Sequence, residues 1–219
     1  MSLDKFNKIY ARIIAESSAP AYNSLTCVCS YAFGDYFEIL QPLGVFTSAA
    51  QAKAAAEKAL DSRFADSGKD WRTGSKIPGL LEQIGQSGEG FAGDADFYEG
   101  YEIVWFDVES SDPAPKFVGG FADEASGADI KLSVAGATLA SVCEALAEKL
   151  VSNDDYNDPA IKTLASSLEA AAGEVMASQH KDGSIYEEDF IDVEEAAAQS
   201  GIKLASSAAS FAWIGQVNG

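Results

Sequence analysis

Three charged residues on two predicted strands could carry hydrolytic chemistry. Asp107 ends the apolar run 101–108, and Asp129 and Lys131 form an acid-x-Lys triplet in the predicted strand 129–134. Two carboxylates in this order can hold Mg²⁺ while a lysine stabilises the attacking water. The pattern predicts a metal-dependent hydrolase or nuclease as the alternative function. Acid-x-Lys triplets also arise by chance, and the negative charge of this chain would repel DNA.

A glycine-rich segment before the apolar run holds the acidic cluster Asp94, Asp96 and Glu99. A D-x-D pair can bind a divalent cation through its carboxylate oxygens. Acidic loops are more often solvated surfaces than metal sites, so Asp94 and Asp96 are candidate ligands in a segment that we expect to be a solvated loop.

The segment from Asp182 to Asp189 is similar to the second half of a calcium-binding EF-hand loop. It has Gly183 at position 6 and an acid at position 12, and helices are predicted on both sides. The first half of the loop does not match the EF-hand pattern, because positions 1 and 3 would be Ser178 and His180 instead of carboxylates. We therefore expect a plain connection between helices, with Asp182 and Asp189 as weak metal candidates.

The three cysteines and the single histidine together give the four ligands that a structural zinc site needs. Cys27, Cys29, Cys143 and His180 would supply four ligands, but a C-x-C pair on one strand is unusual for structural zinc. An odd number of cysteines also excludes a complete disulfide framework within one chain. The expectation is small buried thiols in a reducing compartment, and no cofactor is predicted.

Catalytic and nucleotide-binding signatures are missing from the sequence. There is no P-loop, no dinucleotide fingerprint and no serine in a nucleophile-elbow context, and His180 is the only histidine. This pattern favours a protein that binds or assembles without catalysis.

The charge of the chain is −19, and it is concentrated toward the C-terminal half. No arginine follows Arg72, so that half cannot form the basic face that nucleic acids or anionic membranes require. Between positions 151 and 200 only Lys162 and Lys181 oppose the acids. The twelve acidic residues of this stretch are Asp154, Asp155, Asp158, Glu169, Glu174, Asp182, Glu187, Glu188, Asp189, Asp192, Glu194 and Glu195.

Three interpretations of this acidity stay open. It can be a solvated surface that serves solubility, a surface facing a basic protein partner, or a mimic of nucleic acid. Acids near helix starts, such as Asp158, Glu187 and Glu188, are also explained by the helix dipole. Asp154, Asp155, Glu194 and Glu195 are the predicted partner-binding residues.

Periodicity predicts an α+β fold in which a sheet with packed helices precedes a helical region. The first part should contain an amphipathic helix from Leu3 to Ile14, a β-hairpin over 25–40 that Pro42 and Gly44 break, and a helix from about residue 48 to 64. An irregular stretch over 66–100, with a short helix near 78–86, precedes strands at 101–108, 116–121 and 129–134. These elements form a predicted domain over residues 1–135.

Residues 136–219 are predicted to be helical, either as a separate region or as part of one compound domain. Helices are expected over 138–151, over 159–177 with Pro159 at the first position, and over 187–200 with Gly201 as the stop. The stretch 202–217 carries Phe211, Trp213 and Ile214 and must dock on the rest of the chain.

The sequence contains no apolar run of the roughly 20 residues that a membrane span needs. Charges interrupt residues 1–16, so no signal peptide is expected. The leading hypothesis is a non-catalytic acidic binding or assembly protein, either a virion or structural component or an inhibitor of a basic protein. It would be cytoplasmic or virion-associated.

Overall fold

The structure is a computed structural model. It describes residues 23–34, 37–65, 70–86, 88–95, 100–110, 112, 114–122, 130–151, 159–178, 184–202 and 211–217. The predicted helix from Leu3 to Ile14 lies outside these ranges.

The described chain contains both helices and strands, and elements of one kind often follow one another, which agrees with the predicted mixed α+β class. The elements are β1 (Asn23–Gly34), β2 (Phe37–Phe46), α2 (Ala49–Phe64), α3 (Ile77–Leu81), β3 (Glu89–Ala95), β4 (Gly100–Ser110), β5 (Phe117–Ala122), β6 (Ile130–Gly136), α4 (Leu139–Leu150), α5 (Pro159–Ser178), β7 (Ile185–Tyr186), a 3-10 turn (Glu187–Asp189), β8 (Ile191–Asp192), α6 (Val193–Gln199) and β9 (Phe211–Gln216). In this part of the chain no helix is both long and apolar enough to cross a membrane.

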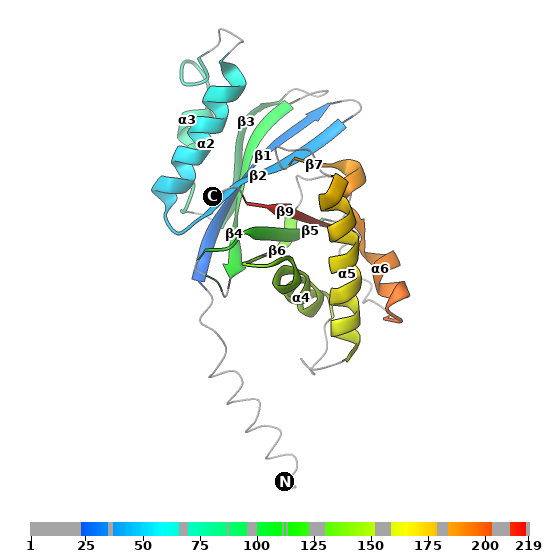
Figure 1. The fold of residues 1–219 in the computed structure, drawn as a ribbon. Helices are drawn as coiled ribbons and strands as arrows, with labels where there is room; N and C mark the ends of the chain where they lie inside the picture. Colours follow the sequence, from blue (N-terminus) through cyan, green and yellow to red (C-terminus); the bar gives the residue numbers. More distant parts are fainter. Residues whose placement is uncertain are drawn as a thin grey trace.

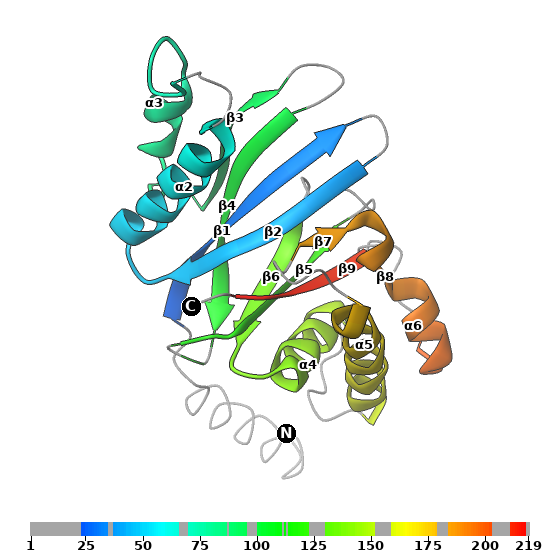
Figure 2. The same ribbon diagram turned by 45° about the horizontal axis from the view of Figure 1, so that its top comes forward.

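One mixed, curled sheet joins the strands in the order β7-β2-β1-β4-β6-β5-β9-β8, with β3 paired to the first part of β4 (Figure 1). Most neighbours are antiparallel, and a short parallel pairing of β4 with β6 links the two halves of the sheet through Glu109↔Val134 and Ser110↔Ala135. Helices α2 and α3 cover one outer side, and α4, α5 and α6 cover the other (Figure 2).

The run 101–108 is almost continuously apolar because both faces of β4 are buried. Val104, Phe106 and Val108 point into a core enclosed by the curl of the sheet, whereas Ile103 and Trp105 point toward α2 and α3. A strand with one face in water would have shown alternating apolar and polar residues instead.

The central core inside the curl takes side chains from both halves of the sheet. Phe106 of β4 meets Trp213 of β9 edge-on, with ring centroids 6.0 Å apart. The central core consists of Leu25, Cys27, Cys29, Tyr31, Leu40, Val104, Phe106, Val108, Val118, Ala135, Ile185 and Trp213. Residues far apart in sequence therefore share one hydrophobic interior.

The hairpin extends further than the sequence predicted. Pro42 and Gly44 were expected to break it, yet β2 runs through both residues to Phe46. The pairing of β1 with β2 shifts register between Val28 and Cys29, which face Gly44 and Pro42, so Leu43 is an extra residue on β2. Such a bulge accommodates a proline that cannot donate a ladder hydrogen bond.

The prediction of an irregular stretch over 66–100 is wrong for its last part. Residues 89–95 form β3, which pairs with β4 from Gly100 to Phe106. A Cβ atom on Gly90 would lie 2.4 Å from the Trp105 ring, so the glycine lets the indole lie flat across the strand. The low strand propensity of this segment is thus overridden by its packing on β4.

The C-terminal segment contains strands as well as helices. Residues 187–200 were expected to be one helix, but a 3-10 turn and β8 precede α6, which starts only at Val193. β7 pairs with β2, and β9 pairs with β5 and β8, so this segment adds strands to the sheet that the earlier residues build. The predicted division of the chain near Gly136 stays a prediction.

Candidate binding groove between α5 and α6

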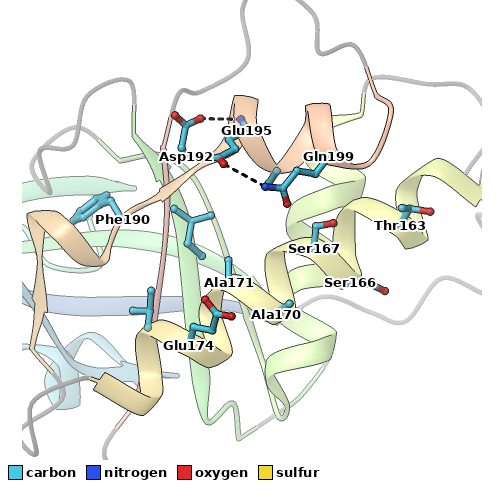
Figure 3. A pocket seen from close by; sticks show the side chains of 13 residues that line it. Thr163, Ser166, Ser167, Ala170, Ala171, Glu174, Phe190, Asp192, Glu195 and Gln199 are labelled. Carbon is cyan, nitrogen blue, oxygen red and sulfur yellow. Dashed lines mark hydrogen bonds between the residues drawn. The ribbon is translucent and has the colours of Figure 1, made fainter.

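A groove of 670 Å³ runs between helices α5 and α6 on the outer side of the sheet (Figure 3). Its volume lies within the range of protein ligand sites. The lining residues are Thr163, Ser166, Ser167, Ala170, Ala171, Glu174 and Val175 of α5, with Phe190, Ile191, Asp192, Glu195, Ala196 and Gln199 from β8, α6 and the residue before them.

Helix α5 has two unlike faces. Ile161, Leu164 and Leu168 recur at helical spacing and pack with α4 against the sheet. The other face carries serine, threonine and alanine, whose small side chains leave the backbone of α5 close to the bottom of the groove. The groove therefore exists because α5 presents almost no bulk on its outer side.

Helix α6 is short but has a defined geometry at both ends. The Asp192 carboxylate accepts a hydrogen bond from the Glu195 backbone N–H at 3.0 Å, which caps the N-terminus. At the other end Gly201 has φ +71°, and the backbone N–H groups of Gly201 and Ile202 donate to Ala198 and Ala197. This is a Schellman motif, and it confirms the predicted stop at Gly201.

A serine pair links α6 to α5 beside the groove. The hydroxyls of Ser167 and Ser200 lie 3.0 Å apart. Ile191, Val193 and Ala197 pack into the same core as α4 and α5. The two helices are thus held against the same core, with the groove between them.

Three carboxylates line the groove, namely Glu174 from α5 and Asp192 and Glu195 from the start of α6. All three side chains are exposed. No lysine or arginine of the described ranges forms an ion pair with them, and the one side-chain contact of Glu195 is to the neutral amide of Gln199 at 3.3 Å. The groove therefore combines a lining of mixed apolar and small polar side chains with three carboxylates that no basic side chain of the described residues neutralises.

The predicted partner-binding residues fall into different places. Glu195 lines the groove, whereas its neighbour Glu194 is exposed on α6 without lining it. Asp154 and Asp155 lie outside the described residues. Glu174 and Asp192 were counted among the acids of the region but were not singled out. The sequence signal that could have located Glu174 is the stripe of small residues on the same face of α5.

The cation-site candidates are not brought together within the described ranges. Asp94 lies in strand β3 instead of a loop, and Asp96, Glu99 and Asp182 are outside those ranges. The Asp189 carboxylate accepts a hydrogen bond from the Tyr186 N–H at 2.9 Å and so supports its own 3-10 turn. Among the residues that the structure describes, no three His, Cys, Asp or Glu side chains gather closely enough to hold a metal ion.

The residues of the hydrolase alternative are only partly described. Asp107 is exposed on β4, and its backbone carbonyl accepts a hydrogen bond from the Ser133 hydroxyl at 2.8 Å. Lys131 lies in β6, but its side chain, like the whole of Asp129, is outside the described part. The hydrolase or nuclease stays a prediction.

The cysteines belong to two separate cores. Cys27 and Cys29 lie in the central core with their sulfur atoms 3.7 Å apart, whereas Cys143 packs between α4 and the sheet. Burial raises the pKa of the Cys27 thiol well above its usual value, and burial together with Glu169 raises the pKa of Cys143 to about 12. The expectation of small buried thiols is confirmed. The separation of Cys143 from the other two argues against the zinc set, whose His180 is not described.

Comparison with protein-family models, curated proteins and solved structures finds no match to this chain. Function must therefore be inferred from its own residues.

Proposed function

We propose that this chain is a non-catalytic binding or assembly protein whose α5–α6 groove receives a basic, amphipathic segment of a protein partner. The observation that carries the proposal is a groove in which the apolar side chains of Val175, Phe190 and Ile191 lie beside the exposed carboxylates Glu174, Asp192 and Glu195. A partner with an apolar face and flanking lysines or arginines would satisfy both features, as in other helix-in-groove complexes.

The energetics of such a contact would be divided between the two features. Apolar burial against Ala170, Ala171 and Phe190 supplies affinity, because each Å² removed from water is worth about 25 cal/mol. Carboxylates at the rim mainly speed association and select a basic partner, and their effect weakens with salt.

Ordinary solubility explains this part of the surface less well. A few acids keep a protein of this size soluble, whereas twelve acids between 151 and 200 repel one another in the folded state. Asp192 has a structural role as a helix cap, and Glu195 lies in the first turn of α6, where the helix dipole favours it. Glu174 lies more than three turns from the start of α5, so no such role explains it.

A fluorescent model peptide tests the proposal directly. The probe is a synthetic amphipathic helix of leucine, alanine and lysine, titrated onto the full chain and followed by anisotropy. Ala170→Trp fills the groove and should weaken binding at least about tenfold, whereas Ala177→Trp, on the same helix but outside the groove, should leave it unchanged.

A second pair of variants separates the groove from general acidity. Glu195→Lys and Glu194→Lys change the net charge equally and lie side by side in the first turn of α6. If the groove is the binding site, Glu195→Lys should reduce the affinity for the model peptide clearly more than Glu194→Lys does. Equal losses for the two variants, or no binding of the probe at low salt, would overturn the proposal and leave a merely solvated acidic surface.

A further inference from the structure

The chain contains one segment whose chemistry matches the groove, and it lies outside the described residues. Within residues 1–22, Lys5, Lys8 and Arg12 outnumber Asp4 and Glu16, so this stretch is net positive although the chain as a whole carries −19. The same stretch is the one for which the sequence predicts an amphipathic helix.

The predicted helix has the two faces that the groove requires. Leu3, Phe6, Ile9, Tyr10, Ile13 and Ile14 would form its apolar side. Lys5 and Arg12, seven positions apart, would flank that side two turns from each other. Their long side chains could reach the carboxylates at a groove rim while the apolar face covers the floor.

The lengths of the groove and the segment also agree. On α5 the lining extends from Thr163 to Val175, which at 1.5 Å per residue is about 18 Å. The apolar positions from Leu3 to Ile14 would cover about 17 Å of helix on the same scale. The apolar face of the segment therefore matches the groove in length.

The position of the groove favours docking between two copies over docking within one. In both ribbon views α4 and α5 lie between the start of β1 and α6, and α6 borders the groove on its far side (Figure 1, Figure 2). Residues 17–22 could span at most about 20 Å. Helices α4 and α5, each about 10 Å in diameter, would together take about 20 Å, so residues 17–22 of the same chain would not extend beyond them into the groove.

We infer that the groove between α5 and α6 binds the N-terminal segment, residues 2–16, of a second copy of this chain. This inference rests on the proposed binding function of the groove and names its partner. Exchange of segments in both directions closes a dimer, whereas exchange in one direction builds a chain of copies. Either form makes this an assembly protein.

A charge swap in the full chain tests the inference. One variant carries Glu174→Lys with Glu195→Lys, and the other carries Lys5→Glu with Arg12→Glu. Sedimentation velocity from about 1 to about 100 µM covers the affinity expected of a contact of this size. Salt near 0.15 M limits the long-range repulsion between copies to about 8 Å.

The expected pattern is reciprocal. The unmodified chain self-associates, and each variant alone associates at least about tenfold more weakly, because like charges would meet at the groove. Mixing the two variants restores association, since each groove then finds a segment of opposite charge. Glu194→Lys with Glu169→Lys, two exposed acids of α6 and α5 outside the groove, is the matched control and should self-associate like the unmodified chain.

Three outcomes overturn the inference, namely an unmodified chain that stays monomeric, variants that associate normally, and a mixture that fails to recover. Docking within one chain is detected as well, because mixing cannot restore an intramolecular contact. If the model peptide still binds the groove in these cases, the proposed function stands and only the named partner is wrong. If the model peptide also fails, both are wrong.

Discussion

The two outer sides of the sheet use acidic residues in different ways. Beside α2 and α3, Asp61 accepts hydrogen bonds from both guanidinium nitrogens of Arg72, at 2.6 and 2.9 Å, and from the Trp71 indole at 2.8 Å. Arg72 also covers the Trp71 ring at 4.2 Å. Beside α5 and α6, Glu174, Asp192 and Glu195 surround a groove and meet no basic side chain of the described residues.

This difference follows from where the basic residues occur in the sequence. All three arginines lie at or before position 72, so an arginine pair such as Arg72–Asp61 needs a residue from the first third of the chain. Lysines do follow, and Lys149 of α4 pairs with Glu109 at 3.2 Å, but no described lysine reaches the three carboxylates of the groove. Lys53 of α2 likewise pairs with Glu57 of the same helix and with Glu82 at the end of α3. The paired acids link neighbouring elements on the α2–α3 side, whereas the three groove carboxylates have no basic partner among the described residues.

The largest expected effect is on the α2–α3 side, where Trp71→Ala removes a buried indole that packs between α2 and the sheet. Trp71 is 5% exposed, and truncation of a buried tryptophan costs about 3–5 kcal/mol of unfolding free energy. Urea unfolding measures the loss. Binding of the model peptide at temperatures where the variant is folded should not change, and a loss of binding would break the comparison.

A smaller effect is expected on the groove side from Gly201→Ala. The residue has φ +71° with open space around a Cβ, so the cost of about 1 kcal/mol comes from backbone strain alone. The loss should concentrate in α6, where hydrogen exchange would report faster opening. Gly79→Ala, at an open position with ordinary φ, is the control and should not destabilise.

The pH dependence of Asp61→Asn should show the structural use of the paired acid. Hydrogen bonds from Arg72 and then Trp71 lower the pKa of Asp61 from 3.8 to about 2. A lowered pKa in the folded state stabilises the protein fully above the unfolded value and stops doing so as pH falls from 3.8 toward 2.

The variant should therefore melt slightly below the unmodified chain near pH 7, because the half-exposed Asp61–Arg72 pair contributes little in water, and the two melting temperatures should converge toward pH 2. Thermal melts followed by circular dichroism across this range measure the difference. A gap that persists at pH 2 would show that the substitution acts through packing instead of charge.

The smallest effect is expected from Glu174→Gln in the groove. This carboxylate has no basic partner in the described residues, so its neutralisation should change the unfolding free energy by less than about 0.5 kcal/mol. The same variant should bind the basic model peptide more weakly. A clear destabilisation would mean that Glu174, like Asp61, serves the fold.

Local sequence patterns were sufficient for much of the secondary structure. The helices expected over about 48–64 and over 138–151 are found as α2 and α4, capped by Ser48 and Thr138. As expected, α5 starts at Pro159 and Gly201 ends α6. Each of these features depends on hydrogen bonds or dihedral angles within a few residues, which the sequence records directly. The strand 101–108 was equally clear because both of its faces are buried.

Elements that depend on distant partners were missed. The sequence of β3 contains two glycines, which disfavour a strand. The strand forms because Gly90 lets the Trp105 side chain of β4 pack against it. β7 and β8 are two residues long, so their strand character comes from pairing with β2 and β9 and not from any local pattern. Pro42 is compatible with β2 only because a bulge at this point absorbs it.

The sequence by itself determined the composition of the acidic surface, the scarcity of basic residues after position 72 and the amphipathic faces of α4 and α5. Only the tertiary structure decided which acids surround a groove, because adjacent residues such as Glu194 and Glu195 are equivalent in composition and differ in the direction they face. It also decided that two sheet halves enclose one core and turn the small-residue face of α5 toward α6. Side-chain direction and long-range pairing depend on the packing of the whole chain, which no short stretch of sequence contains.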